Sequence, residues 1–447
     1  MARKDSVGKE VLGYIRTLYY LEEMIRRSYW SRAKLLKYQE KKLRKVLKHA
    51  YDFVPFYHKI FREAQIRPED AKSVSDLSKL PIVRKNEIRE NTDSVISEKF
   101  RTRNLRTLLT SGSTGKPLRV LITRDEDNFR KAKHLRANIS CGHNPWDSWV
   151  TITSPSHFSE ATRFQQILGF YAPKFVSVFD DLPRQMSMID KMRPDILDGY
   201  SSSLYLLAKG VKRSGLKTIR PKSVFGGAEL IDGSSRRFIE TVFEAPFYDQ
   251  YATIEFERMA WQCPAKSCYH IDADALIIQF VDKDGEEVSE GESGEMVCTS
   301  LFNYAMPFIR YAIGDVGIPT DEKCACGRKL PLMKIIEGRN DSLLFLPNGR
   351  TLSPRTFTIA INKFQLSKYI EQFRVIQKKI DYFEIQIKIQ NENVNRASVE
   401  RELVEHLRKM LHIEMEEITF DIRFVEEIPL DKSGKLMIVS SELRQQL

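Results

Sequence analysis

The sequence lacks the long hydrophobic runs of a membrane protein, because none of its 447 residues belongs to a stretch approaching 18 consecutive apolar residues. The opening residues 1–5 are not followed by the apolar core of a secretory signal, so we expect a cytoplasmic protein. Six cysteines are too few for a small fold held by disulfides. With 42% apolar and 29% charged residues, the composition excludes the disordered class and indicates a globular, enzyme-sized protein.

Most of the net charge of +11 belongs to the N-terminus, where residues 1–50 hold 14 Lys and Arg against 5 Asp and Glu. The segment 31–50 is basic and amphipathic, with one apolar side formed by Leu36, Leu43, Val46, Leu47 and Ala50. Such a segment could contact anionic lipid or nucleic acid. The favoured interpretation is a solvated helix that covers the core, so we expect no nucleic-acid partner, and peripheral contact with a membrane stays the less favoured alternative.

Three textures follow one another along the chain. Helical spacing dominates residues 6–65 and breaks at Val54-Pro55-Phe56, where the proline disfavours helix in the preceding residue. From 105 to 260, short strands such as 150–153 and 174–178 alternate with helices such as 185–192 and 204–212, which predicts a mainly parallel sheet. Between 270 and 320, strands at 276–281 and 295–299 around an Asp284-Gly285 turn predict antiparallel hairpins.

A separate small unit is predicted after Gly338. Two strands alternate as half-buried β structure, and one helix repeats its apolar residues at helical spacing. The strand residues are Phe383, Ile385, Ile387 and Ile389, then Phe420, Ile422 and Phe424; the helix residues are Val399, Leu403, Leu407 and Leu411. We therefore expect a compact α+β domain at 340–447 after a domain at 1–339 that contains a β-rich subdomain at about 265–337.

One loop has the composition of a phosphate cradle. Residues 110–117 read T-S-G-S-T-G-K-P, with four hydroxyl side chains near two glycines and Lys116. Backbone N–H groups, hydroxyls and one ammonium could all point at a polyphosphate there. The loop is not a Walker loop, because Thr110 stands where that motif needs glycine and Pro117 where it needs Ser or Thr. Taken alone, it is equally an ordinary hydroxyl-rich turn.

Five further motifs accompany this loop in a fixed order. They read G-G-A-E at 226–229, Y-A-T-I-E at 251–255, Y-A-I-G-D at 311–315, G-R-N-D at 338–341 and P-L-D-K-S-G-K at 429–435. The set resembles the adenylate-forming superfamily. The closest likeness is to its phenylacetate:CoA ligase branch, including relatives encoded with capsular polysaccharide genes. It extends to residues 39–57 and 199–204, so nearly the whole chain is covered.

The resemblance implies the α/β fold of these enzymes and their chemistry. Members activate a carboxylic acid with ATP, form an acyl-adenylate and pyrophosphate, and usually pass the acyl group to the thiol of coenzyme A. Such a site must neutralise charge and hold the carboxylate in line with the α-phosphorus. Glu255 matches the acid that holds Mg²⁺. The β/γ-phosphates would be held by Thr110, Ser111, Gly112, Ser113, Thr114, Gly115 and Lys116.

The same likeness assigns the nucleotide contacts. Tyr251, followed by Ala252, matches the aromatic that stacks on adenine, and Asp315, with Arg339 nearby, matches the acid that accepts both ribose hydroxyls. The strand end beside adenine comprises Gly226, Gly227, Ala228 and Glu229. Lys435 matches the mobile lysine that reaches the α-phosphate during adenylation.

The match is incomplete in two motifs, and it also assigns a hinge. Ala252 replaces the common glycine, and Ile254 stands where a hydroxyl residue usually precedes the glutamate. Ala312 and Ile313 replace commoner polar residues before Asp315. Asp341 matches the position about which the small domain swings. His157 follows a predicted strand and could border the acyl pocket, although a polar loop histidine is as good an interpretation.

Clustered cysteines predict a structural zinc site. Two soft ligands near 263–270 and two at 324–326 could close a tetrahedral centre that staples a subdomain with little core. The chosen ligands are Cys263, His270, Cys324 and Cys326, with Cys268 as a substitute for His270. The alternative is a set of reduced, buried thiols. Similar C-x-C-G-R turns occur in the family branch that the motifs resemble.

Two functional alternatives stay open at the level of sequence. The adenylate could be passed to an amine or hydroxyl, for instance on a glycan, in polysaccharide biosynthesis. A non-catalytic relative that binds nucleotide is the other. The expected partners are a small carboxylic acid and coenzyme A, and the chain is expected to be a monomer or homodimer. The acid is not identified, because pocket residues come from scattered loops.

Overall fold

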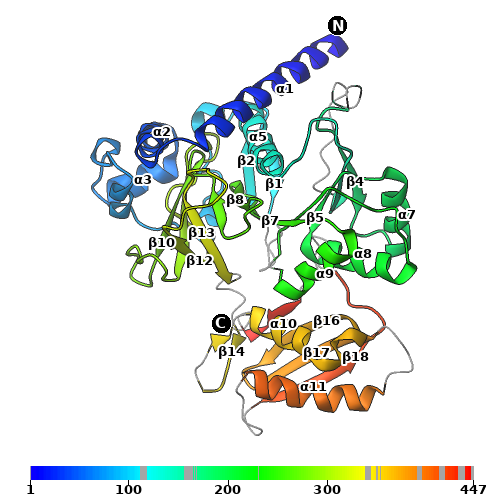
Figure 1. Ribbon diagram of the computed structural model, residues 1–447. Coiled ribbons are helices and arrows are strands. Elements are labelled where there is room, and N and C mark those ends of the chain that lie inside the picture. Colours follow the sequence, from blue (N-terminus) through cyan, green and yellow to red (C-terminus); the bar gives the residue numbers. More distant parts are fainter. Residues whose placement is uncertain are drawn as a thin grey trace.

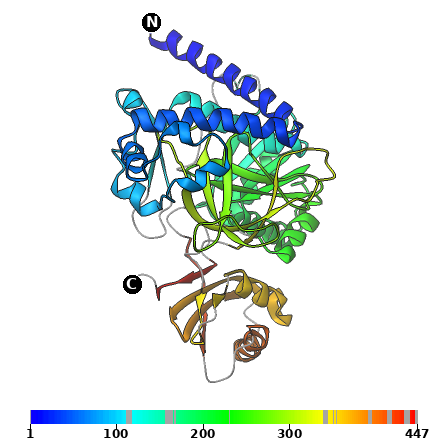
Figure 2. The same cartoon turned by 90° about the vertical axis from the view of Figure 1, so that its left-hand side faces the viewer.

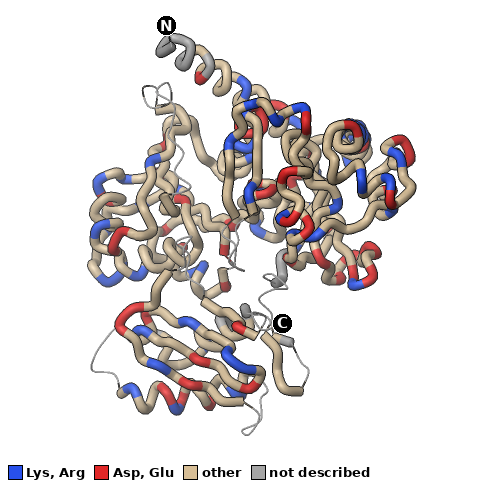
Figure 3. The backbone as a smooth tube through the Cα atoms, turned by 180° about the vertical axis from the view of Figure 1, so that it is seen from behind, with Lys and Arg blue, Asp and Glu red and all other residues tan. Residues whose placement is uncertain are grey.

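A large mixed sheet with covering helices is followed by a smaller α+β unit (Figure 1). The computed structural model describes residues 2–110, 118–155, 165, 167, 169–229, 231–337, 344–348, 351–352, 354–389, 395–411, 418–430 and 438–443. The helix at the N-terminus projects from the large unit, and the smaller unit lies at the opposite end of the molecule (Figure 2). Basic and acidic residues intermingle over both units (Figure 3).

The N-terminal quarter is helical, as its spacing predicts. It contains α1 (Ala2–Arg27), α2 (Arg32–Phe53), α3 (Pro55–Glu63) and α4 (Lys85–Glu90), with 3₁₀ turns at Pro68–Asp70, Ser75–Lys79 and Glu98–Phe100. The predicted break is present, but Pro55 starts a new helix, because proline fits the first turn, where its missing N–H is not needed. The expectation that Leu36 is buried was wrong: Leu36 is exposed and Leu35 is buried. At this end of α2, the side that carries Leu35 is the one covered by the rest of the chain.

The phosphate-loop candidate joins two antiparallel strands. They are β1 (Arg106–Leu109) and β2 (Arg119–Ile122), and the backbone N–H of Thr110 donates to Leu118 O at 3.0 Å. The chain then enters α5 (Arg124–Ser140), which begins with a capping box between Thr123 and Glu126. The hairpin formed by β1 and β2 therefore leads directly into α5.

The parallel strands expected between 105 and 260 are present. Their order is β4-β3-β5-β6-β7, formed by β4 (Pro173–Ser177), β3 (Trp149–Thr153), β5 (Ile196–Tyr200), β6 (Ser223–Gly227) and β7 (Phe247–Thr253). Three helices pack on one face and bury an aliphatic core there: α7 (Leu182–Met192), α8 (Ser201–Ser214) and α9 (Gly233–Phe243). This is the crossover arrangement that alternating strands and helices require.

The antiparallel hairpins extend the same sheet. After β7 the order continues β8-β9-β13-β12-β11-β10, and every pair in this half is antiparallel. The strands are β8 (Glu257–Gln262), β9 (Tyr269–Ile271), β10 (Leu276–Val281), β11 (Gly294–Ser300), β12 (Tyr311–Thr320) and β13 (Leu332–Glu337). Within the described residues, the parallel strands and the antiparallel hairpins thus form one eleven-stranded sheet, and its two halves meet at β7 and β8.

The C-terminal unit is the small α+β structure that the periodicity predicts. Its four-stranded sheet has the order β18-β17-β16-β19, and α11 packs its four predicted apolar residues into a separate core. The elements are β14 (Leu344–Phe345), β15 (Thr351–Leu352), α10 (Pro354–Lys363), a 3₁₀ turn (Gln365–Tyr369), β16 (Ile370–Lys379), β17 (Tyr382–Ile389), α11 (Arg396–Leu411), β18 (Thr419–Phe424) and β19 (Val439–Ser441).

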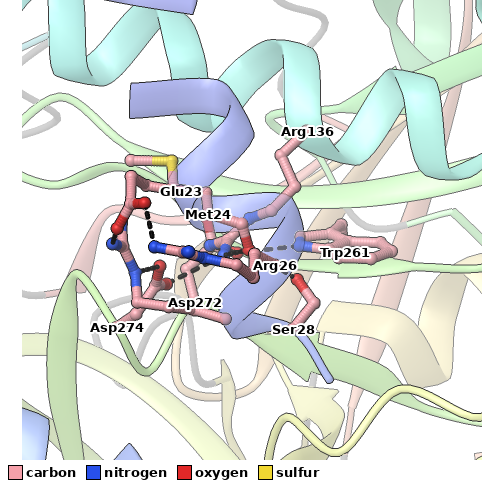
Figure 4. A network of polar contacts seen from close by, with 9 residues as sticks. Glu23, Met24, Arg26, Ser28, Arg136, Trp261, Asp272 and Asp274 are labelled. Carbon is pink, nitrogen blue, oxygen red and sulfur yellow. Dashed lines mark hydrogen bonds and ion pairs between the residues drawn. The ribbon is translucent and has the colours of Figure 1, made fainter. Parts of the chain in front are cut away.

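A buried ionic network joins α1 and α5 to the connection between β9 and β10 (Figure 4). Arg136 of α5 is fully buried and contacts Asp272 at 2.5 Å and Asp274 at 2.9 Å. Arg27 of α1 also pairs with Asp274, at 2.9 Å. The indole N–H of Trp261 donates to Asp272 at 2.8 Å. Because a lone buried charge is very costly, each of these groups depends on the others.

We expect Asp274→Asn to destabilise the protein by about 3–5 kcal/mol, because the change leaves Arg27 and Arg136 without a shared counter-charge. Urea unfolding followed by circular dichroism measures this. Asp321→Asn is the matched control, since Asp321 pairs with Arg32 on the surface and its loss should change little. Equal unfolding midpoints for Asp274→Asn and the wild-type protein would contradict the role of the network.

Candidate active site and metal centre

The candidate site lies where the parallel strands end. Ligands in open α/β sheets bind at the carboxyl ends of the strands, and β5 and β6 end at Tyr200 and Gly227. Beyond these ends, the N–H of Ser202 donates to the Glu229 carboxylate at 2.9 Å. A Cβ on Gly227 would lie 2.7 Å from Gln250 O, so the close packing of β6 on β7 requires glycine there. The G-G-A-E motif is thus tied to both neighbouring strands.

Two residues that the motifs assign to the nucleoside contact each other directly. The hydroxyl of Tyr251, on β7, donates a hydrogen bond to the carboxylate of Asp315, on β12. These strands belong to different halves of the sheet and lie 64 residues apart in the chain. The contact fixes the direction of the Asp315 carboxylate and leaves the face of the Tyr251 ring as the part suited to a flat ligand.

Glu255, the candidate Mg²⁺ ligand, is a buried carboxylate with two partners. The Tyr311 hydroxyl donates to Glu255 Oε1 at 3.0 Å, and Lys85 Nζ of α4 lies 3.4 Å from the same oxygen. Burial, with the carboxylates of Asp315 and Glu255 nearby, raises the pKa of the Cys298 thiol well above its usual range. Four motif residues, at 251, 255, 311 and 315, are therefore held in one region of the fold.

Two cationic side chains of α5 hold the turn that carries Glu255. The Arg130 guanidinium donates to Ile254 O at 2.9 Å and Glu255 O at 3.3 Å. Lys133 Nζ donates to Phe256 O at 2.9 Å, and burial lowers the pKa of this lysine to about 8. Backbone carbonyls are therefore the acceptors for two buried cations, which fixes the turn against α5.

Sequence reasoning missed these cations, as well as Lys85 and the Tyr311 hydroxyl. The signal available was the spacing of Arg130, Lys133 and Arg136, three residues apart, which places them near one another on a helix. That pattern is usually a solvated face. In this helix all three side chains are buried.

Several predicted site residues lie outside the described part of the chain. They are Ser111, Gly112, Ser113, Thr114, Gly115, Lys116, His157, Arg339, Asp341 and Lys435. Thr110, the first residue of the loop, is described and buried, and its hydroxyl accepts a hydrogen bond from Leu118 N at 2.8 Å.

Four predicted metal ligands come together. The ligand atoms of Cys263, His270, Cys324 and Cys326 all lie within 4.8 Å of one another. A tetrahedral zinc centre with metal–sulfur bonds of about 2.3 Å places its ligand atoms roughly 3.8 Å apart, so the group fits. Burial lowers the pKa of His270 to about 4, which keeps the imidazole neutral, as a metal ligand must be. The Sγ of Cys268 points instead to Glu322, at 3.4 Å.

The four candidate ligands, Cys263, His270, Cys324 and Cys326, lie beside the junction of α1 and α2. The N–H of Lys329 donates to Ser28 O at 2.8 Å, and the Arg328 guanidinium lies over the Trp261 and Tyr29 rings. The Trp261 ring lies 5.0 Å from that of His270. The cysteine turn is therefore coupled to both the N-terminal helices and β8.

None of the described helices combines the length and the apolar character that crossing a membrane requires.

Three likenesses to known proteins agree with this geometry. The family model of the CapK C-terminal domain matches residues 344–442. A phenylacetate-coenzyme A ligase of Thermus thermophilus is 26% identical over 322 residues, which cover 70% of this chain and 72% of that protein. Protein CapK of Staphylococcus aureus is 23% identical over 399 residues, which cover 85% of this chain and 83% of that protein.

A solved structure shares the fold over nearly the full length. It is that of 2-hydroxyisobutyryl-CoA ligase in the postadenylation state with 2-HIB-AMP, at a TM-score of 0.76 and 20% identity, covering 94% of this chain and 92% of that chain. This likeness confirms the predicted fold class. The chain is thus similar in sequence to phenylacetate-coenzyme A ligase and to protein CapK, and it shares the fold of a solved acyl-CoA ligase.

Proposed function

We propose that this protein is an ATP-dependent acid:CoA ligase. The carboxylate of an acid attacks the α-phosphorus of ATP, pyrophosphate leaves, and the thiol of coenzyme A then attacks the acyl carbonyl and releases AMP. The observation that carries the proposal is the junction of motifs at one place: Tyr251 bonded to Asp315, and Glu255 bonded to Tyr311. The reaction is also supported by the similarity to a phenylacetate-coenzyme A ligase, which covers 72% of that protein's length.

The described residues suit the charges of this reaction. Asp315, oriented by the Tyr251 hydroxyl, would accept the ribose hydroxyls, while the ring of Tyr251 packs on adenine. Glu255 would hold Mg²⁺, because both of its contacts involve Oε1 and no described residue hydrogen-bonds to Oε2. When bound, Mg²⁺ neutralises phosphate charge. Lys116 and Lys435 would supply the remaining positive charge near the triphosphate.

The backbone clamp on the Glu255 turn has a role in this scheme. Arg130 and Lys133 fix the carbonyls of residues 254–256, so the carboxylate needs no reorganisation when nucleotide binds. Ile254 cannot supply the hydroxyl that the motif usually has before the glutamate. The α-phosphate contact would then depend more heavily on Lys435.

The proposed reaction requires the C-terminal domain to move relative to the larger one. The domain at 340–447 would swing about Asp341 between adenylating and thioester-forming positions. In this structure it contacts α8, because Lys209 Nζ donates to Ile370 O at 2.7 Å and to Glu371 O at 2.6 Å. Arg213 of the same helix lies 3.6 Å from the Glu371 carboxylate. The swing would break these contacts.

A second candidate shares the adenylation step but has a different acceptor. The adenylate would pass to an amine or hydroxyl in polysaccharide biosynthesis. The match of residues 344–442 to the CapK C-terminal domain favours this version, because it agrees with the likeness of the motifs to relatives encoded with capsular polysaccharide genes. The four candidate metal ligands have the same role in both versions. A structural Zn²⁺ held by three thiolates and one imidazole would link the β8–β9 and β12–β13 connections.

The direct test is pyrophosphate release over aryl, short-chain and amino acids, with and without coenzyme A. Thioester formation with at least one acid supports the ligase. Brisk ATP–pyrophosphate exchange without any thioester would favour the second candidate, and failure to bind ATP in calorimetry would reject both.

Lys435→Ala should abolish ATP–pyrophosphate exchange with the correct acid while leaving the thermal unfolding midpoint unchanged, because it removes a point charge from the α-phosphate. Lys432→Ala, three residues earlier in the same motif, is the matched control and should keep exchange near the wild-type rate. Normal exchange in Lys435→Ala would contradict the assignment.

Purified protein should contain about one zinc per chain. Cys326→Ser should lose that zinc and lower the unfolding midpoint, since it removes a ligand of the group. Cys268→Ser is the control and should retain the metal, because its sulfur lies outside the group. Zinc-free wild-type protein, or equal metal content in the two variants, would remove the site.

A further inference from the structure

A second polar cluster lies between α5 and the sheet, beside the Glu255 turn. Its centre is His134, one residue after Lys133. The imidazole Nε2 lies 3.4 Å from Asp198 Oδ2, and Nδ1 lies 3.5 Å from Glu257 Oε1. Arg258 Nη2 approaches Nδ1 at 2.9 Å. Neither the motifs nor the ionic network of Figure 4 includes these residues.

The cluster has more buried hydrogen-bonding atoms than it has partners. Arg258 and Asp198 expose 4% and 8% of their surface. No hydrogen-bond partner is found for six buried atoms of the cluster and its neighbour Thr151: His134 Nε2, Thr151 Oγ1, Asp198 Oδ2, Glu257 Oε2, Arg258 Nε and Arg258 Nη1. Thr151 of β3 pairs directly with Asp198 of β5, so both side chains lie on the same face of the sheet. Buried polar atoms without partners are costly and rare in folded proteins.

Its place in the fold puts the cluster close to the reacting end of the proposed site. Glu257 and Arg258 begin β8, two and three residues after Glu255. Asp198 lies two residues before the carboxyl end of β5, in register with Thr151 and one residue before Gly199, the partner of Gly226. α5 lies against the sheet beside β8 (Figure 1). The unpartnered atoms therefore lie beneath the same strand ends that carry the nucleotide motifs.

Cationic donors and anionic acceptors are both present. Although burial raises it, the pKa of Glu257 is lowered to about 2 by the hydrogen bond with His134 and the charge of Arg258, so Glu257 is ionised at neutral pH. Arg258 Nε and Nη1 are donors without a hydrogen-bond partner, and Glu257 Oε2 and Thr151 Oγ1 are acceptors without one, while Asp198 Oδ2 faces His134 Nε2 at 3.4 Å. A purely apolar acid would leave these donors and acceptors without hydrogen bonds, whereas a hydroxyl or amino substituent can hydrogen-bond with them.

We propose that these residues form the specificity end of the acid pocket, and that the acid carries a hydroxyl or amino substituent away from its carboxyl group. The proposal rests on the proposed function and narrows its substrate class. Asp198, Glu257, Arg258 and Thr151 bind the substituent, and His134 links the acidic side chains. Phenylacetate, which has no such substituent, is then a poor substrate for this chain.

The experiment compares acids in matched pairs by ATP–pyrophosphate exchange with the full-length protein. Each pair differs by one substituent far from the carboxyl group: phenylacetate with 4-hydroxyphenylacetate, benzoate with 4-aminobenzoate, and butyrate with 4-hydroxybutyrate. For at least one pair we expect kcat/KM to be at least roughly tenfold higher for the substituted acid, because a site built for a hydrogen-bonding group rejects the analogue that lacks it.

Variants identify the residues responsible. Asp198→Leu should reduce the preference for the substituted acid at least roughly tenfold while exchange with its unsubstituted partner persists. Asp198→Asn, which keeps the shape, should reduce the preference less and serves if Asp198→Leu folds poorly. Asp195→Asn is the control, because Asp195 lies just before the same strand and pairs with Lys222 at the surface. The control should keep the wild-type preference.

Two results would overturn the inference and can be told apart. If the wild-type protein prefers the unsubstituted acid in every active pair, or if both Asp198 variants keep the wild-type preference, the acid pocket lies elsewhere and the ligase assignment stands. If no acid of any kind supports exchange, the ligase assignment fails, and the specificity proposal fails with it.

Discussion

The burial of three cations on α5 is the constraint on which the site depends. Arg130, Lys133 and Arg136 follow one another at every third residue and are all buried. A buried cation needs fixed partners, because the cost of leaving water is otherwise not recovered. The partners come from two distant segments: the carbonyls of 254–256, and the carboxylates of Asp272 and Asp274. Pairing these charges therefore fixes where both segments lie.

The position of α5 in the chain extends this constraint to other parts of the candidate site. The helix begins directly after the hairpin that carries the phosphate-loop candidate, and its capping glutamate, Glu126, also accepts hydrogen bonds from the backbone of Tyr304 and Ala305. One helix thus ties together the β1–β2 hairpin, the Glu255 turn and the segment before β12. The sheet continues unbroken from β7 to β8, so Tyr251 of the parallel half can reach Asp315 of the antiparallel half.

Regular periodicity was enough to predict most of the elements. The alternation at 383–389 and the helical spacing at 399–411 became β17 and α11, since an apolar pattern with one period has one way to bury its side chains. The grouping of Cys263, His270, Cys324 and Cys326 was predicted from residue types, because soft ligands in two short clusters have few structural uses. The order of the motifs placed the end of a strand at 226–229, and β6 ends there, at Gly227.

The parts that the sequence did not reveal depend on contacts between distant segments. Leu36 and Leu35 are adjacent leucines on one helix, and only the neighbouring chain decides which is covered. The Tyr311 hydroxyl on Glu255 and the lysine at 85 come from elements more than 50 residues away in the chain. In the sequence, the three cationic residues of α5 have the pattern of a solvated helix face. Their burial becomes evident only from their contacts with the Glu255 turn and with Asp272 and Asp274.

The account is tested most directly by a crystal structure of the protein with a non-hydrolysable acyl-adenylate analogue, an acyl-sulfamoyl adenosine. We expect the adenine to lie on the Tyr251 ring, the ribose hydroxyls within hydrogen-bonding distance of the Asp315 carboxylate, and the sulfamoyl group on the side of the Glu255 turn. An analogue bound away from Tyr251 and Asp315 would contradict the claim that these motifs form one nucleotide site.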